Sequence, residues 1–309
     1  MMKKVLVTGG TGFIGSNLIK GLLKLNYRLT SLDNNSTGNK KNEFDGVEYI
    51  EDDITNIYKL DNDFDLCFHF AAQSRVQPSF DDPEESFRVN VFGTSKVMEW
   101  AKQNNIKVVY AGSSSKHHNP SDSPYAMYKF LGEEVCKLYK NSFNVNVEIS
   151  RFYNVYGPGE NIDEKFGNVI GIWSAKIKKK QPIPIVGDGE QTRDFTFVSD
   201  IAAAFIAAAE ASVSGEIINI GSDNTYSVNR LVELIDGGDV VHIPKRPGEP
   251  DCTWADISKA RRLLNWEPKV SLEEGVGIVL DNIDFWREAP LWTPESIADA
   301  TKNWFKYLG

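Results

Sequence analysis

The sequence predicts an α/β fold with a doubly wound parallel sheet and a smaller mixed α/β lobe. Short apolar runs alternate with longer helical patterns through the first half of the chain, which is typical of parallel strands joined by crossover helices. A glycine-rich segment at residues 8–15 follows the first apolar run and opens the first helical pattern. After residue 157 the chain changes to loops rich in glycine and proline between helical segments, which indicates the second lobe.

The expected elements follow one another in the order that such a sheet needs. Strands are expected where a short apolar run is bounded by polar or turn residues, at 5–7, 28–32, 47–50, 66–70, 107–111 and 145–151. Helices are expected where apolar residues recur at helical spacing, at 13–25, 84–104, 125–141 and 198–210. The last of these helices lies beyond the change in texture, so we expect the chain to cross between the two parts.

The composition is that of an ordinary globular chain that can bury a sizeable core. Of its 309 residues 41% are hydrophobic and 25% are charged, and the formal net charge is −9. Such an acidic chain is poorly suited to nucleic acid or an anionic membrane, because each phosphate contact needs a local cation. The longest apolar run, residues 201–209, is too short to span a bilayer. We expect neither a nucleic-acid partner nor a membrane anchor.

The cysteines give no sign of a disulfide framework or a metal site. Cys67, Cys136 and Cys252 are far apart, odd in number and not in metal-ligand spacing. We therefore expect a reducing, cytoplasmic location and no metal.

The glycine-rich segment predicts a Rossmann-type dinucleotide site. Glycines between a strand and a helix let the backbone approach a pyrophosphate, which then sits at the positive helix N-terminus. Asp33 ends the second strand, 18 residues after Gly15, where a carboxylate can accept hydrogen bonds from an adenosine ribose. The same charge would repel a 2′-phosphate, so NAD is preferred to NADP. The alternative, in which these residues only form turns, is weakened by their placement between strand and helix.

A serine, a tyrosine and a lysine form the candidate catalytic set. Tyr125 and Lys129 are four residues apart at the start of a helix, so they share one face. An ammonium beside a phenol favours the phenolate, so we expect Lys129 to lower a pKa that starts near 10. Ser113 ends the fifth strand, where ligands of open sheets bind, and can share the proton. The tyrosine–lysine spacing alone is common on helices, so the prediction depends on Ser113 and the glycine turn.

Further motifs at 32–34, 52–54, 69–72, 90–94 and 151–158 occur in the same order as in a known family. With them, the chain resembles the extended short-chain dehydrogenases/reductases, and among these the NAD-dependent epimerase/dehydratase group typified by UDP-glucose 4-epimerase. The resemblance covers nearly the whole chain. It implies an NAD-binding Rossmann domain at 1–166, to which 194–221 return, and a substrate-binding lobe at 167–193 and 222–309. It also implies a homodimer formed through the helices at 84–104 and 125–141.

The resemblance implies a set of residues around the cofactor. They are Gly9, Gly12, Phe13, Ile14, Gly15, Asp33, Asn34, Asn35, Ser36, Thr37, Gly38, Asp53, Ile54, Phe70, Ala71, Ala72, Gln73, Asn90, Tyr125, Lys129 and Tyr153. In this set Asp53 and Ile54 would flank the adenine, and Tyr153 would lie near the nicotinamide. Asn90 resembles the helix asparagine that braces the active-site network.

The resemblance also implies residues around a nucleotide-sugar substrate. They are Ser113, Asn154, Asn168, Val169, Ile185, Val186, Arg193, Arg246, Glu249 and Thr253. Arg193 and Arg246 would grip the diphosphate by charge-assisted hydrogen bonds, and Glu249 would accept from the nucleoside ribose. The alternative for both arginines is surface ion pairing. Thr253 aligns with a gate beside the sugar's 2-substituent, where a bulkier tyrosine excludes N-acetyl groups, which suggests that N-acetylhexosamines could enter.

The segment between Ser113 and Tyr125 departs from the family pattern. It has 11 residues, fewer than is usual in the family, and His117-His118 replace the expected aromatic–glycine pair. Because this loop helps to line the sugar pocket, the resemblance does not carry the sugar specificity over.

The expected function is an NAD-dependent nucleotide-sugar 4-epimerase that passes through a transient 4-keto sugar. A UDP-hexose or a UDP-N-acetylhexosamine is the expected substrate. A dehydratase of the family has a carboxylic pair after its serine or threonine, but here Ser114 and Ser115 stand there. A nucleotide-sugar dehydratase or decarboxylase, a reductase that consumes its cofactor, and a UDP-glucuronate epimerase remain alternatives. A non-enzymatic NAD-sensing protein is a further one.

Overall fold

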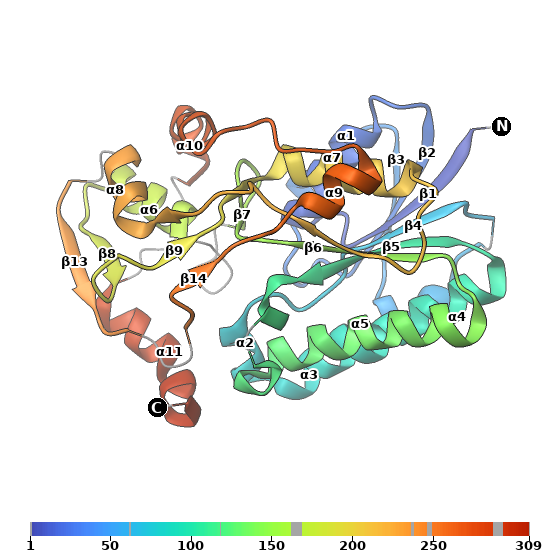
Figure 1. Ribbon diagram of the computed structural model, residues 1–309, viewed down its shortest axis with the longest axis horizontal. Coiled ribbons are helices and arrows are strands. Elements are labelled where there is room, and N and C mark those ends of the chain that lie inside the picture. The colour runs from blue at the N-terminus through green and yellow to red at the C-terminus, as the bar shows by residue number, and fades with distance from the viewer. Residues whose placement is uncertain are drawn as a thin grey trace.

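A seven-stranded parallel sheet organises the larger part of the molecule (Figure 1). The computed structural model describes residues 2–61, 63–117, 119–161, 169–235, 238–245, 249–286 and 293–308. The strands are β1 (Lys3–Thr8), β2 (Tyr27–Asp33), β3 (Val47–Glu51), β4 (Leu66–His69), β5 (Lys107–Ser113), β6 (Val147–Phe152) and β11 (Ile217–Ile220). Their order is β11-β6-β5-β4-β1-β2-β3, with every neighbouring pair parallel. The predicted fold class is confirmed, and the first six strands lie where the sequence predicted them.

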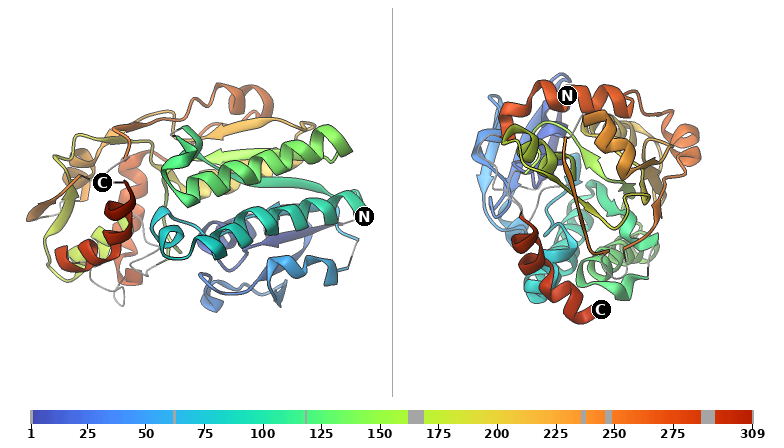
Figure 2. Two further views of the ribbon diagram at one scale, coloured as in Figure 1. Left: turned by 90° about the horizontal axis from the view of Figure 1, so that it is seen from below. Right: turned by 90° about the vertical axis from the view of Figure 1, so that its left-hand side faces the viewer.

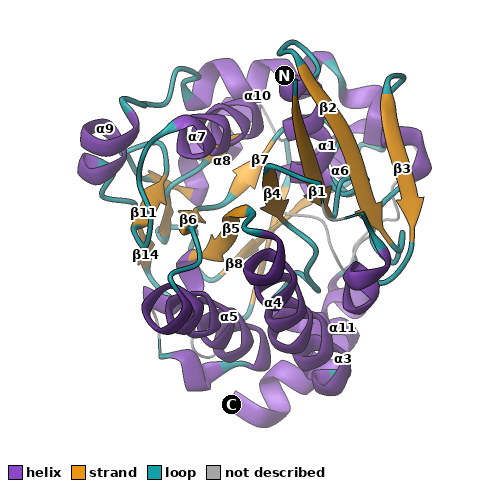
Figure 3. Cartoon of the chain, turned by 90° about the vertical axis from the view of Figure 1, so that its right-hand side faces the viewer, coloured by secondary structure: helices purple, strands orange, loops and turns teal. Residues whose placement is uncertain are grey.

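Helices cover both faces of this sheet (Figures 1 and 3). One face packs against α1 (Phe13–Leu22), α7 (Val198–Glu210) and α9 (Ser258–Leu264). The other packs against α4 (Thr94–Asn104) and α5 (Pro124–Phe143), which lie side by side. Because both faces are covered, central strands are apolar throughout, and Val5, Leu6 and Val7 of β1 have no exposed surface.

The helix expected at 84–104 is three consecutive pieces rather than one. It consists of α3 (Pro83–Phe87), a π-helical turn at Arg88–Gly93 and α4. Asp82 caps α3 by accepting a hydrogen bond from the backbone N–H of Glu85. π-Turns often occur at functional sites, and this one contains Asn90, which faces the loop after β4. The helix expected at 13–25 is shorter than predicted, because the chain turns after Leu22.

The second lobe lies beyond one end of the sheet, on the left in Figure 1. Its strands are β8 (Ile183–Val186), β9 (Thr192–Arg193), β12 (Tyr226–Ser227), β13 (Val240–Ile243) and β14 (Cys252–Thr253). Its helices are α6 (Val169–Lys178), α8 (Val228–Ile235) and α10 (Leu272–Asp281), and they share one apolar core. The short strands β7 (Val155–Tyr156) and β10 (Thr196–Phe197) pair where the chain passes between the parts. The domain boundaries stay predictions.

Two further helices pack against each other although they are far apart in the sequence. They are α2 (Val76–Asp81) and the C-terminal α11 (Pro294–Leu308), seen in Figure 2. Asn303 Nδ2 donates to Asp81 Oδ1 at 2.9 Å, and the rings of Phe80 and Tyr307 stack with centroids 6.1 Å apart. Short 3₁₀ turns complete the described elements at Lys40–Asn42, Ile54–Lys59, Ser114–His117, Pro120–Asp122 and Ile283–Trp286. None of the helices in the described ranges is long and apolar enough to cross a bilayer.

Candidate functional site

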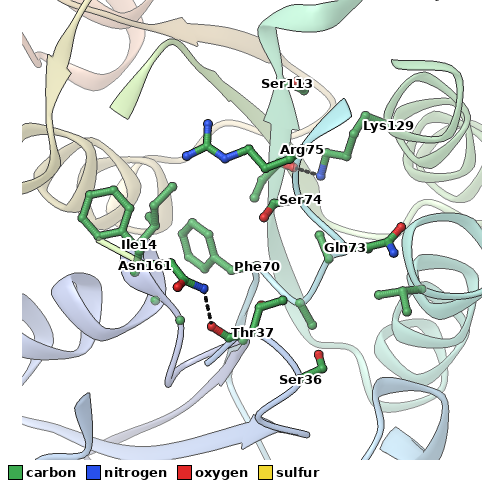
Figure 4. Close-up of a pocket in the computed structure, with 18 of the residues that line it drawn as sticks. Ile14, Ser36, Thr37, Phe70, Gln73, Ser74, Arg75, Ser113, Lys129 and Asn161 are labelled. Atoms are coloured by element: carbon green, nitrogen blue, oxygen red, sulfur yellow. Dashed lines mark hydrogen bonds between the residues drawn. The ribbon is translucent and has the colours of Figure 1, made fainter. Parts of the chain in front are cut away.

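A cavity of about 550 Å³ opens at the carboxyl ends of the central strands (Figure 4). It lies where the strand order reverses between β1 and β4, the position at which open α/β sheets bind ligands. Predicted cofactor and catalytic residues gather around it. Those in its lining are Gly9, Gly12, Phe13, Ile14, Gly15, Asp33, Asn34, Ser36, Thr37, Asp53, Ile54, Phe70, Ala71, Ala72, Gln73, Ser113, Tyr125 and Lys129, together with Asn154 from the substrate set.

The glycine turn brings backbone close to backbone at the base of the cavity. Gly9 has a φ of +75°, and a Cβ there would lie 2.8 Å from the Ala71 backbone nitrogen. A Cβ at Gly15 would lie 2.1 Å from the Gly9 carbonyl oxygen. Side chains are therefore excluded at both positions, and α1 begins directly behind the turn with its N-terminus at the cavity. This shape fits the pyrophosphate of a dinucleotide.

Asp33 is held rigidly at the end of β2. Its Oδ2 accepts from the Thr11 backbone N–H at 3.0 Å, and its Oδ1 accepts from the Asn35 N–H at 2.9 Å. A carboxylate oxygen can accept more than one hydrogen bond, so both oxygens keep acceptor capacity for ribose hydroxyls. Asn35 itself is absent from the described cavity lining, and its Oδ1 accepts from the Thr11 hydroxyl.

Asp53 lines the cavity, but its carboxylate already has a partner. Arg88 donates to both oxygens of Asp53 at 2.8 Å, and the Thr55 N–H also donates to it. These hydrogen bonds hold the pKa of the carboxyl well below its usual range. The side chain of Asp53 thus fastens the π-turn to the loop after β3.

Asn90 and Tyr153 lie behind the cavity rather than in its described lining. Asn90 Oδ1 accepts from the Gln73 N–H at 2.9 Å, and its Nδ2 donates to the Gln73 carbonyl at 3.0 Å. Asn90 therefore braces the loop after β4, as the resemblance implies. Tyr153 is 1% exposed and packs in the core under the sheet. Gly38 is likewise absent from the lining and packs closely against Thr11.

The catalytic set is assembled by the end of β5 and the first turn of α5. Ser123 caps α5 by accepting from the Ala126 N–H, and Tyr125 and Lys129 follow on the cavity side. The Tyr125 backbone N–H donates to Ser79 Oγ at 3.0 Å, which ties α5 to α2. Lys129 Nζ donates to the Ala111 carbonyl at 2.6 Å, the dashed contact beside Lys129 in Figure 4.

The pKa of Tyr125 is raised rather than lowered as expected, and Lys129 is not among the causes of its shift. Burial raises the pKa of Tyr125, and a hydrogen bond with Ser113 and the positive charge of Arg75 lower it in part. The ammonium of Lys129 is directed at the Ala111 carbonyl, and burial lowers its own pKa to about 8. Loss of water around the phenol therefore outweighs the hydrogen bond with Ser113 and the charge of Arg75.

A second cavity, of about 280 Å³, lies in the smaller lobe. Its lining is Val186, Gly187, Asp188, Glu190, Gln191, Arg193, Lys245, Glu249, Pro250 and Asp251. Arg193 Nη2 donates to Glu249 Oε1 at 3.0 Å, so two residues predicted to bind separate parts of a nucleotide pair with each other. Val186 lines this cavity, whereas Ile185 is buried in the core behind it and Val169 begins α6. Asn168 and Arg246 lie outside the described residues.

Asn154 connects the main cavity to the smaller lobe. Its Nδ2 donates to the Asp194 carbonyl and to Thr253 Oγ1, each at 3.0 Å. Asp194 is fully buried and accepts from the N–H groups of Ser222 and Ala255. Thr253 therefore lies directly behind a residue that lines the main cavity.

Two contributors were not predicted from the sequence. Ser79, with no exposed surface, holds the backbone of Tyr125, and Arg75 lines the cavity beside the catalytic set. Arg75 is two residues beyond the predicted cofactor residue Gln73. That proximity is the only feature of the sequence that could have indicated a role for Arg75. A serine inside a short helix carries no sequence signal of its own.

A glycine turn, a ribose-directed carboxylate and a serine–tyrosine–lysine set on one doubly wound sheet define the short-chain dehydrogenase/reductase class. The chain belongs to the NAD-dependent epimerase/dehydratase family, whose model matches residues 5–221. This membership confirms the resemblance, and NAD is the cofactor.

Relatives that match along their whole length are named for three different sugars. The UDP-glucose 4-epimerase of Mycolicibacterium smegmatis is 32% identical over 313 residues, covering 92% of this chain and 98% of the relative. The UDP-N-acetylglucosamine 4-epimerase of Methanobrevibacter ruminantium, solved with UDP-N-acetylmuramic acid, is 30% identical with a TM-score of 0.84, covering 92% and 98%. The UDP-glucuronic acid 4-epimerase of Bacillus cereus, solved with UDP-glucuronic acid and NAD, is 32% identical with a TM-score of 0.82, covering 91% and 99%.

Proposed function

We propose that this chain is a UDP-sugar 4-epimerase that inverts one hydroxyl without net use of NAD. The observation that carries the proposal is the convergence of Ser113, Tyr125 and Lys129 on the cavity that holds the glycine turn and Asp33. Bound NAD supplies a hydride acceptor that becomes the donor in the return step. The groups that move the proton belong to the protein.

Each member of the catalytic set has a distinct task in this proposal. Tyr125 takes the proton of the sugar hydroxyl, and Ser113, which bonds to the phenol, shares it. Lys129 holds a positive charge one helical turn from Tyr125 and is fixed by the Ala111 carbonyl. The resulting 4-keto sugar would turn within the cavity, and Tyr125 would return the proton to its oxygen.

Ser114 and Ser115 favour epimerisation over elimination or decarboxylation. Both line the main cavity, and the Ser115 hydroxyl bonds to that of Ser113. A serine hydroxyl is neither a strong acid nor a strong base near neutral pH, so it cannot drive loss of a 6-hydroxyl or of carbon dioxide. The keto sugar is therefore left to be reduced.

The second cavity is the proposed site of the UDP moiety. Arg193 and Lys245 supply cations, while Gln191 and the backbone around Gly187 supply polar groups. The Arg193–Glu249 pair is 11% and 20% exposed, so Glu249 holds the guanidinium in place before a diphosphate arrives.

The direct test is to incubate purified protein with UDP-glucose, UDP-N-acetylglucosamine and UDP-glucuronate without added NAD, and to resolve products by NMR. We expect a 4-epimer of unchanged mass from at least one of them. Tyr125→Phe should lower kcat by about 10³-fold with little change in folding, because it removes the proton carrier. Loss of water or carbon dioxide, or stoichiometric reduction of NAD, would contradict the proposal. Unchanged function in Tyr125→Phe would instead favour the NAD-sensing alternative.

We also propose a homodimer in the cytoplasm. On α3, the π-turn that follows it and α5, the large apolar side chains of Phe87, Phe92, Leu138 and Phe143 are each 45–54% exposed. Such a row on adjacent helices is suited to a partner subunit. All three cysteines are free, which suits a reducing compartment. Light scattering of the purified protein checks the oligomeric state.

A further inference from the structure

Arg75 has a backbone conformation that ordinarily belongs to glycine. Its φ is +85° and its ψ is 144°, a combination that the Cβ of an L residue disfavours. A residue persists in such a conformation only where its surroundings hold it, and residues of this kind cluster at ligand sites. An arginine in such a strained backbone conformation therefore indicates that its side chain has a functional role.

The chain on both sides of Arg75 is fastened to the active-site framework. On one side, Asn90 forms two hydrogen bonds with the backbone of Gln73. On the other, Ser79 of α2 accepts from the N–H of Tyr125. The backbone of the strained residue therefore lies between two fixed points.

The Arg75 side chain lines the main cavity together with the candidate catalytic set. Figure 4 shows it extending across the cavity away from Lys129, above Phe70 and toward the side where Ile14 is drawn. Arg75 lines the same cavity as Ser113 and Tyr125, and its positive charge lowers the pKa of the phenol in part. The glycine turn and Asp33, which suit the dinucleotide, lie on other strands. An arginine is charged at every accessible pH, so the cavity presents a permanent cation.

We propose that Arg75 recognises a carboxylate on the sugar, so that the enzyme prefers a nucleotide-linked uronic acid to a neutral hexose. The inference rests on the proposed function and names its substrate class. A guanidinium presents N–H donors in a planar fork that matches a carboxylate, and charge-assisted bonds of this kind are the strong ones. The hydroxymethyl group that a neutral hexose has in place of the carboxylate is uncharged, so it cannot form a charge-assisted pair with the guanidinium.

The experiment compares kcat/KM for UDP-glucuronate with kcat/KM for UDP-glucose. We expect the wild-type ratio to exceed one and to fall about 30-fold in Arg75→Gly, the scale of one charge-assisted hydrogen bond. Glycine suits a φ of +85°, so this variant should keep its melting temperature. Arg75→Lys should retain part of the preference. Arg28→Gln, at an exposed arginine on β2, is the matched control and should leave the ratio unchanged.

The ratio separates recognition of the sugar from other effects of the guanidinium. Removing the charge beside Tyr125 raises the pKa of the phenol for every substrate, and that effect cancels in the ratio. Equal losses for both substrates in Arg75→Gly would overturn the inference, because they would place the guanidinium on the diphosphate or on Tyr125 alone. A wild-type preference for UDP-glucose would also overturn it while leaving epimerisation intact. The absence of a 4-epimer from every nucleotide sugar tested would instead contradict the proposed function itself.

Discussion

At Tyr125 burial and charge act in opposite directions on one phenol. Burial raises its pKa, whereas the hydrogen bond with Ser113 and the charge of Arg75 lower it. A base catalyst works best when its pKa lies near the working pH. The two neighbours therefore bring the phenol back toward a useful range, and Ser113 does so while touching the reacting oxygen.

Removing the Ser113 hydroxyl should move the pH dependence of the reaction. Because that hydrogen bond lowers the pKa of Tyr125, Ser113→Ala should raise it, and the rising acidic limb of the kcat profile should shift to higher pH. At neutral pH we expect kcat to fall about 10- to 100-fold. Ser121→Ala, at an exposed serine in the next turn, is the control. If the acidic limb of the kcat profile did not shift in Ser113→Ala, Ser113 would not control the pKa of Tyr125.

Thr253 gives a second test at the scale of single residues. Its hydroxyl accepts from Asn154, which lines the main cavity, so a tyrosine would break this bond and crowd the cavity wall. We expect Thr253→Tyr to lower turnover of UDP-N-acetylglucosamine at least about 10-fold more than that of UDP-glucose. Cys252→Ser, at the exposed neighbour, should change neither. Equal activity of wild type and Thr253→Tyr on UDP-N-acetylglucosamine would contradict the predicted role of Thr253 as a gate for the N-acetyl group.

The sequence predicted that Ser113, Tyr125 and Lys129 meet at one cavity, but not their electrostatics. Helical spacing shows that Tyr125 and Lys129 share a face, yet it does not show which acceptor a long lysine side chain reaches. Here the acceptor is the Ala111 carbonyl. Likewise, separate motifs predicted roles for Arg193 and Glu249 one by one, and only the fold reveals that they pair.

At the scale of elements, the short helix α2 supports more of the active site than its six residues suggest. It follows Arg75, its Ser79 holds the first turn of α5, and α11 packs on its other side. The interrupted helix at 84–104 has a comparable role, since its π-turn places Asn90 against the loop after β4. The apolar pattern of 84–104 predicted one continuous helix and did not separate these pieces.

Ser79→Ala should act through Tyr125 without touching substrate. The buried N–H of Tyr125 would lose its acceptor, which should lower the free energy of unfolding by about 1 kcal/mol. Because Ser79 is a positioning residue, we expect kcat to fall several-fold with little change in KM, and Ser79→Thr to restore part of it. Kinetics and urea unfolding measure both effects against Ser121→Ala. A fall in stability with unchanged kcat would limit Ser79 to a structural role.

At the scale of the whole molecule, the reversal of strand order between β1 and β4 creates the site. It brings the glycine turn, Asp33 and Ser113 from three strands to one edge of the sheet. This much was predictable, because alternating strands and helices determine the sheet and the sheet determines where strand ends meet. The smaller lobe was less predictable, since its two-residue strands depend on tertiary pairing rather than on sequence pattern.

The sheet also contains a carboxyl group that should make stability depend on pH. Glu148 on β6 has no exposed surface, and burial raises its pKa to about 7. Between about pH 4.5 and 7 the folded state keeps a proton that the unfolded state has lost, so stability falls as pH rises through this window. The loss attributable to Glu148 is about 3 kcal/mol.

Glu148→Gln removes this titration, so its free energy of unfolding should fall less than that of wild type between pH 5 and pH 8. Urea unfolding at the two pH values measures the difference. Glu43→Gln, at an exposed glutamate, should follow wild type. Parallel losses in wild type and Glu148→Gln would show that the group ionises normally in the fold.

The docking of α11 on α2 has a consequence for how the enzyme matures. The hydrogen bond between Asn303 and Asp81 joins residues 222 positions apart, so the ribosome must add most of the chain before it can form. Nascent domains generally fold from the N-terminal side first. We therefore expect the sheet and its cofactor cleft to exist on the nascent chain before the helix beside Arg75 receives its last support. The growing chain would then be able to bind NAD before it is able to turn over substrate.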